Sequence, residues 1–251
     1  MIITALNIPV SQYALAKDAG INTVWGGDPV VCATAGLQSI PALPIKPNGE
    51  IAYDVLGHSS AVGFSLPEDI PIADLSAAQE AIQRLQNTSP RSVFPGLVSA
   101  TYTRMLDYLG AESVEEYYRA FAELAPSAIP MLCHYPFHWM EEDEAQTPQG
   151  DIIEYERNLA MMQEVFPTWW GWVQVSAHSH YADADGNPEW IFDELDPAAV
   201  VFQVDKLVAA GCSGIGYFCW GPLKGDGIVG KDGKPSKHFS AIQAINRNPG
   251  N

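Results

Sequence analysis

Eight short apolar runs with β-strand character follow one another along the chain, and segments with helical periodicity separate them. The runs cover residues 2–8, 21–25, 37–45, 61–66, 92–98, 128–135, 170–177 and 214–220. A repeated strand–helix order favours parallel strands with the helices outside, and eight such units close a (β/α)8 barrel. We therefore expect an α/β fold in which one TIM barrel spans residues 1–251.

Capping signals mark several of the intervening helices. Ser11 is the expected N-cap of the first helix, and Gly20 is its expected end. Ser113 and Glu116 have the spacing of a capping box. Asp196 followed by Pro197 predicts another helix start, and a short helix is expected near residues 51–56.

The charge of the chain restricts its partners. Its 30 acidic and 13 basic residues give a formal net charge of −17, which disfavours binding to nucleic acids or to anionic membranes. No apolar stretch reaches the roughly 18 residues that a membrane-spanning helix needs. The N-terminus lacks the basic segment of a signal peptide, which leaves the localisation open, and an oligomer is possible.

The cysteines do not predict a metal or redox site. Cys32, Cys133, Cys212 and Cys219 are scattered, and no CxxC pair is present. We interpret them as small buried apolar residues. The chain also lacks the GxSxG, P-loop, early GxGxxG and HExxH motifs, so no cofactor is expected.

Two carboxylates follow the fourth run, at Glu68 and Asp69. In a barrel of this type the C-terminal ends of the strands form the catalytic face, so both residues are candidate catalytic groups. We expect Glu68 to act as a general acid. The alternative is that the two acidic residues complement the dipole of a helix N-terminus.

Histidines and aromatic residues gather after the sixth and seventh runs. Because these runs are expected to be adjacent strands, their ends should form one ligand-binding cluster for a saccharide-like polar molecule. The predicted ligand-binding residues there are His134, Tyr135, His138, Gln174, His178 and His180. Trp25 and Asp28 after the second run, and Trp220 after the eighth, are further candidates.

A metal site and a purely structural role are the alternatives for this cluster. His178 and His180 have i, i+2 spacing, and His134 could supply a third ligand of a metal-dependent hydrolase. The histidines could equally be hydrogen-bonded or surface residues, and Trp220 could belong to the core. We do not expect a metal.

Several segments match a known pattern in the same order along the chain. Gly-Phe-Ser-Leu-Pro-Glu at 63–68 is similar to a fourth strand that ends in an acid/base glutamate, and Tyr-Pro-Phe at 135–137 is similar to the turn after a sixth strand. Trp-Val-Gln at 172–174 is similar to a seventh strand that carries the nucleophile. Residues 214–220 resemble an eighth strand that ends in a sugar-stacking tryptophan, and 244–246 fit the closing helix. The chain thus resembles the glycoside-hydrolase-like barrels related to clan A.

Two departures from that family pattern change what the resemblance implies. Pro67 stands where the family has asparagine, and Gln174 stands at the nucleophile position. An amide cannot form the glycosyl ester of a retaining mechanism, which needs two carboxylates about 5 Å apart. An inverting mechanism remains open, with Glu68 as the acid and Asp28, Asp183 or Asp226 as the base.

The resemblance implies a protein that acts on or binds a carbohydrate. The alternative hypothesis is a catalytically silent barrel that serves as a binding or structural module, for example in an extracellular or virion-associated assembly. The kind of sugar and the linkage are left open by the sequence, because fold alone does not fix chemistry.

Overall fold

A computed structural model describes residues 1–43, 58–88, 94–98, 103–140, 148–176, 178–182, 188–192, 195–223 and 225–247. Its main sheet has seven strands, and every strand pair in it is parallel. In spatial order the strands are β3 (Gln38–Ile40), β2 (Thr23–Trp25), β1 (Ile2–Ala5), β10 (Gly214–Phe218), β7 (Trp170–Gln174), β5 (Ile129–Leu132) and β4 (Pro95–Val98).

The extended segment 61–66 fills the eighth position and closes the ring between β3 and β4. Ala61 and Ser65 form parallel bridges to Ser39 and Ala42 on one side. On the other side the amide of Leu66 donates a hydrogen bond to the carbonyl of Pro95 at 2.9 Å. The molecule is therefore the expected α/β protein with a TIM-barrel fold, and the strands lie at all eight predicted positions.

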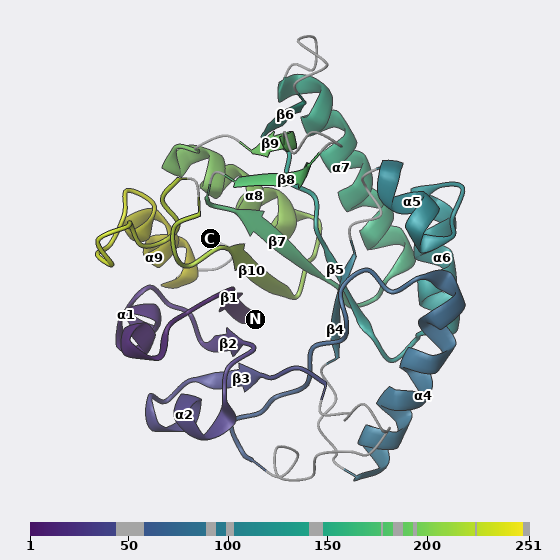
Figure 1. Ribbon diagram of the computed structural model, residues 1–251, viewed down its shortest axis with the longest axis horizontal. Coiled ribbons are helices and arrows are strands. Elements are labelled where there is room, and N and C mark those ends of the chain that lie inside the picture. Colours follow the sequence, from purple (N-terminus) through teal and green to yellow (C-terminus); the bar gives the residue numbers. More distant parts are fainter. Residues whose placement is uncertain are drawn as a thin grey trace.

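Helices surround this ring of strands, as Figure 1 shows. They are η1 (Val10–Gln12), α1 (Tyr13–Asp18), α2 (Pro29–Thr34), α4 (Ile72–Thr88), α5 (Thr103–Leu109), α6 (Val114–Leu124), α7 (Pro148–Val165), α8 (Pro197–Ala209) and α9 (Phe239–Arg247). None of the helices within the described ranges is long and apolar enough to cross a membrane.

The capping predictions are mostly confirmed. The side chains of Ser113 and Asp196 accept hydrogen bonds from the first turns of α6 and α8. Gly20 follows α1 with a φ of 80°, as expected for a residue that ends a helix. The prediction for Ser11 is wrong, because this residue lies inside η1 and α1 begins only at Tyr13. The short helix expected near 51–56 lies outside the described residues.

A second, antiparallel sheet was not predicted. It contains β6 (His138–Met140), β9 (Pro188–Phe192) and β8 (His178–Ala182), with β9 in the middle. The seventh run therefore does not continue as one strand through residue 177: β7 ends at Gln174, and β8 belongs to the small sheet. This sheet is built from the segments that follow β5 and β7, two neighbouring strands of the barrel.

The apolar core has two parts, one inside the barrel and one between the strands and the helices. Inside, two tryptophans of β7 lie against two glycines of β10. A Cβ atom on Gly214 would come within 2.6 Å of the Trp170 ring, and one on Gly216 within 2.4 Å of the Trp172 ring. The glycines thus make the space that the two indoles occupy.

Candidate functional site

The alternation of side chains along the strands decides which residues face the barrel axis at its C-terminal end, here called the mouth. Trp170 and Trp172 of β7 belong to the inner core, whereas Val173 belongs to the outer one. By the same alternation, Gln174 faces inward at the end of β7. Phe218 of β10, which is paired in register with Gln174, also packs on the inner core.

Four aromatic residues meet at the mouth: Trp25, Tyr135, Trp172 and Phe218, which we call the mouth aromatic cluster. The Trp25 and Trp172 rings make an edge contact, with centroids 5.5 Å apart and planes at 68°. Tyr135 stacks on Phe218 at 5.6 Å and 29°. Tyr135 and Trp172 are buried, while Trp25 and Phe218 are half-buried and keep accessible surface.

Gln174 is completely buried, and a residue of the helical layer holds its backbone. The side chain of Gln203 on α8 accepts a hydrogen bond from the Gln174 amide at 2.9 Å and donates one to its carbonyl at 3.1 Å. This occurs where β5 has left β7, since the two strands are paired only at Trp170 and Gly171. Gln203 thus makes the two backbone hydrogen bonds that a neighbouring strand would otherwise provide at Gln174, and it holds the end of β7 at the mouth.

His134 points away from the mouth, although it was predicted to line it. Its ring nitrogen is hydrogen-bonded to Asn158 at 3.1 Å, and its ring makes an edge contact with Tyr155 at 5.4 Å. Both partners belong to α7. Its neighbours Cys133 and Tyr135 pack instead in the inner core. A contact between His134 and a ligand at the barrel axis therefore has no support in this arrangement.

Trp220 is also placed away from the mouth aromatic cluster. It has no exposed surface, it packs in the outer core, and its indole N–H donates to the side chain of Gln12. Phe218, two residues earlier, is the aromatic residue of β10 that reaches the mouth. Strand alternation divides the residues of β7 and β10 into two sets that face opposite sides. The sequence could not show that the set with Trp172 or Phe218 faces the barrel axis, because this depends on how β10 lies against its neighbours.

The predicted carboxylates have different surroundings. Glu68 is exposed at the C-terminal end of segment 61–66. Asp69 adopts a φ of 51° and lies near α6: burial raises the pKa of the Tyr117 hydroxyl there, and the Asp69 charge raises it further. Asp28 caps α2, accepting from the amides of Val30 and Val31 at 2.8 and 3.1 Å. Asp28 therefore has a structural role as the cap of α2.

The three other histidines predicted to bind the ligand lie in the small sheet. His138 of β6 and His178 of β8 are both paired with Phe192 of β9, so their backbones share one row of the sheet. The backbone of His180 is paired with Trp190, two rows further along. Within the ranges that the structure describes, no group of three or more His, Cys, Asp or Glu side chains is arranged to hold a metal ion.

The four cysteines are buried, as the sequence predicted, and none of them forms a disulfide. Burial raises the pKa of the Cys212 and Cys219 thiols to about 12. Because the thiolate is the reactive form, neither residue is suited to act as a nucleophile at neutral pH.

No protein-family model matches the chain, and no curated protein matches it in sequence. Solved structures do match it, and the similar proteins include three glycosidases. The β-galactosidase of the psychrophilic Marinomonas ef1 has a TM-score of 0.62 at 8% identity, covering 98% of this chain and 59% of that one. A family 18 N-acetylglucosaminidase from Paenibacillus barengoltzii gives 0.56 at 8% identity, over 97% and 99% of the two chains.

The third match is active domain 2 of a thermostable chitinase from Pyrococcus furiosus, in a structure with chito-oligosaccharides. Its TM-score is 0.57 at 12% identity, covering 98% of this chain and 94% of that one. The chain therefore has the (β/α)8 barrel fold found in glycoside hydrolases. Identities this low describe the fold, so the function must be argued from the mouth itself.

Proposed function

We propose that this protein binds a carbohydrate at the mouth of its barrel. The observation that carries the proposal is the mouth aromatic cluster, in which two accessible rings, Trp25 and Phe218, each contact a buried one. Such rings offer flat apolar faces against which the C–H groups of a sugar ring can pack. The chito-oligosaccharides in the chitinase structure of the same fold support this class of ligand.

The buried rings make this platform rigid. Trp172 is fixed against Gly216, and Tyr135 is fixed by its stacking on Phe218. A platform that is already ordered loses little conformational entropy when a ligand binds. The side chains of His138, His178 and His180, which the sequence predicts as ligand contacts, lie outside the described part of the structure.

Hydrolysis is the second candidate function, and the exposed position of Glu68 beyond segment 61–66 favours it. Gln174 cannot act as a nucleophile, so the reaction would invert the anomeric centre, with Glu68 as the acid. Asp28 is occupied as a helix cap, which leaves Asp226, half-buried in the loop after β10, as a candidate base. Asp183, the third candidate, lies outside the described residues.

The decisive experiment compares three variants in binding and hydrolysis of chito-, xylo- and galacto-oligosaccharides. Trp25→Ala removes an accessible ring, Glu68→Gln removes the proposed acid, and Tyr108→Ala removes an exposed ring on α5, outside the mouth, as a control. Losing roughly 80 Å² of apolar contact at about 25 cal/mol per Å² corresponds to about 2 kcal/mol, or about thirtyfold in Kd.

We expect calorimetry to show binding by the wild type and by Tyr108→Ala, and binding at least about tenfold weaker by Trp25→Ala. Hydrolysis by the wild type that is lost in Glu68→Gln, with binding retained, would establish the enzyme. Binding without turnover would identify a silent, lectin-like barrel. If none of the sugars binds to the wild type, the carbohydrate proposal is wrong and a structural module remains.

A further inference from the structure

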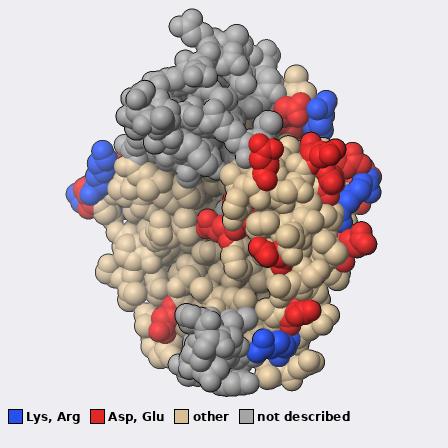
Figure 2. All heavy atoms as spheres, turned by 45° about the vertical axis from the view of Figure 1, so that its right-hand side comes forward, with Lys and Arg blue, Asp and Glu red and all other residues tan. Residues whose placement is uncertain are grey.

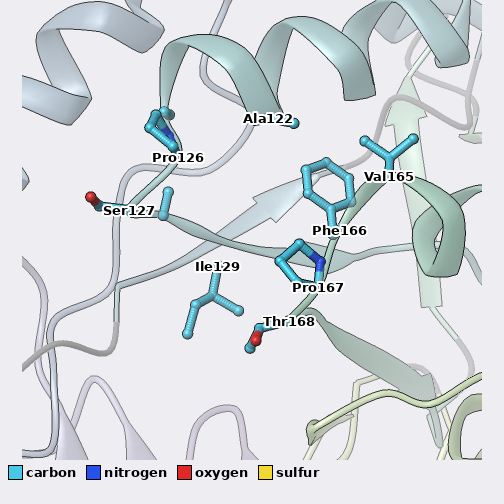
Figure 3. Close-up of a pocket in the computed structure, with 10 residues that line it drawn as sticks. Ala122, Pro126, Ser127, Ile129, Val165, Phe166, Pro167 and Thr168 are labelled. Atoms are coloured by element: carbon cyan, nitrogen blue, oxygen red, sulfur yellow. The ribbon is translucent and has the colours of Figure 1, made fainter.

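A pocket of about 440 Å³ lies at the end of the barrel opposite the mouth, where α6 and α7 end and β5 and β7 begin. Figure 3 shows that its walls come from the two helix ends, with the side chain of Ile129 between them. We call it the helix-end pocket. Its apolar lining includes Ala122, Pro126, Ile129, Val165, Phe166 and Pro167.

The two walls have matching sequences. Residues 123–127 read Glu-Leu-Ala-Pro-Ser, and residues 164–168 read Glu-Val-Phe-Pro-Thr. In each case the helix ends at the second residue of the motif, and the next strand begins two residues after its Ser or Thr. The pocket is thus enclosed by two equivalent turns, each of which contributes a proline to the lining.

These turns leave helix carbonyl groups without their usual donors. The i+4 donor for the Ala122 carbonyl would be Pro126, which has no N–H. The amide of Ser127 donates instead to the side chain of Gln79 at 3.0 Å, and the amide of Ala128 donates to the carbonyl of Ala125 at 2.9 Å. The carbonyl groups of Ala122 and Glu123, in the last turn of α6, therefore lack their usual intrahelical donors. On α7, Pro167 removes the donor for Gln163 in the same way.

The electrostatic surroundings are negative. Both helix C-termini carry the negative end of a helix dipole, and neither last turn contains a basic residue. Each last turn contains an exposed glutamate instead, Glu123 or Glu164. The nearest cation along α6, Arg119, is shared between Glu115 and Glu164 at 2.9 and 3.3 Å. Figure 2 shows acidic residues prevailing on the side of the molecule that carries these helices.

We propose that the helix-end pocket binds a small primary amine with an apolar body. Its apolar walls would surround the hydrocarbon part, and the ammonium group would donate to the helix-end carbonyls within the field of two helix dipoles. A cation bound in the pocket would offset the repulsion between the glutamate charges and the negative ends of the two helix dipoles. The site is separate from the mouth, so this inference does not depend on the proposed function.

The first test uses three probes with the same phenyl body and different charges: phenethylamine, phenethyl alcohol and phenylacetate. Binding to the full chain is measured at neutral pH by calorimetry and by ligand-observed NMR. We expect the amine to bind, the alcohol to bind at least about fivefold more weakly, and phenylacetate not to bind. Equal binding of the amine and the alcohol, or no binding of the amine at millimolar concentration, would overturn the proposal.

The second test places the amine in this pocket. Thr168→Trp and Ala122→Trp fill it from the two walls, and Ala120→Trp on the same helix lies outside it as the control. Both pocket variants should abolish binding of the amine, and the control should keep it. Thr168 is exposed, so its variant retains the test if Ala122→Trp fails to fold. Unchanged binding by a folded Thr168→Trp would contradict the assignment.

The third test isolates the charge contribution. The double variant Glu123→Gln with Glu164→Gln should weaken binding of the amine by about two- to tenfold and leave binding of the alcohol unchanged. Asp74→Asn with Glu80→Gln, two exposed changes on α4, controls for the loss of the same net charge. An equal effect of this control would show that only the overall charge matters, and would contradict a local role of the two glutamates.

Discussion

Two glycines decide how the barrel interior is filled at the scale of single residues. Gly214 and Gly216 alternate with Ile215 and Tyr217 along β10, and both face inward. Every larger residue would collide there with an indole of β7. The mouth aromatic cluster depends on this arrangement, because the ring of Trp172 contacts the ring of Trp25.

Gly216→Ala is expected to destabilise the protein by about 1–3 kcal/mol, the usual cost of overpacking a core. The added Cβ would lie 2.4 Å from Trp172 Cε3 and 2.5 Å from Met131 Cε. Urea denaturation followed by circular dichroism measures the change. Gly221→Ala is the matched control, because a Cβ at that position meets nothing within 4 Å. Equal stability of the two variants would contradict the packing argument.

The thiol of Cys212 makes the free energy of unfolding depend on pH in the alkaline range. Burial raises its pKa from the ordinary value of 9.0 to about 12, so the folded state favours the neutral thiol. The stabilisation is complete below the unfolded pKa and is lost as the pH rises from about 9 toward about 12. Between pH about 9 and about 12, the free energy of unfolding should therefore fall less for Cys212→Ala than for the wild type. Parallel pH dependences of the two unfolding free energies would exclude a contribution from Cys212.

At the scale of elements, the separation of β5 from β7 shapes the mouth. The last two residues of β5 pair with the first two of β7, and the segments that follow the two strands pair in the small sheet. The open edge of β7 would leave buried backbone groups unsatisfied if no side chain reached it. Gln203 of α8 provides both the donor and the acceptor, so helix and strand are joined at Gln174.

Gln203→Leu should lower the free energy of unfolding by about 2–4 kcal/mol, because it leaves two buried backbone groups of Gln174 without partners. It should also increase hydrogen exchange at the Gln174 amide more than elsewhere in β7. The control is Gln163→Leu, at an exposed position of α7. Uniform exchange along β7 in the Gln203 variant would show that this residue does not hold the strand end.

At the scale of the whole molecule, the excess of acidic residues dominates the surface. The formal net charge of −17 is spread over a single barrel, and Figure 2 shows few basic groups among the acidic ones. The ion pairs of Arg119, Arg157, Lys234 and Arg247 have exposed side chains, so each contributes little. Self-repulsion therefore opposes folding in dilute salt.

Raising the NaCl concentration from about 0.01 M to about 0.1 M shortens the Debye length from about 30 Å to about 10 Å, and should increase the melting temperature. Differential scanning calorimetry measures the shift. Sucrose at equal osmolality is the control for effects of the solute that do not depend on charge. A melting temperature that stays constant or falls over this range of NaCl would contradict a role for self-repulsion.

The sequence by itself was sufficient for the order of the barrel strands and for several helix ends. Apolar periodicity and caps are local signals, so Ser113, Asp196 and Gly20 could be recognised without a structure. The end of β2 at Trp25 was predicted as well, whereas β5 and β7 end at Leu132 and Gln174, three residues before their predicted ends. The small sheet escaped prediction because its three strands are short and pair across distant segments.

Only the tertiary structure decided which side each of these residues faces. Neighbouring residues of a strand point to opposite sides, so a change of one position exchanges the barrel axis for the helical layer. His134 packs against α7 while its neighbour Tyr135 reaches the mouth. Trp220 lies two residues after Phe218, past the end of β10, where strand alternation no longer applies, and it packs in the outer core. The strand register and the positions of α7 and α8 fix these orientations, and both depend on contacts between residues far apart in the chain.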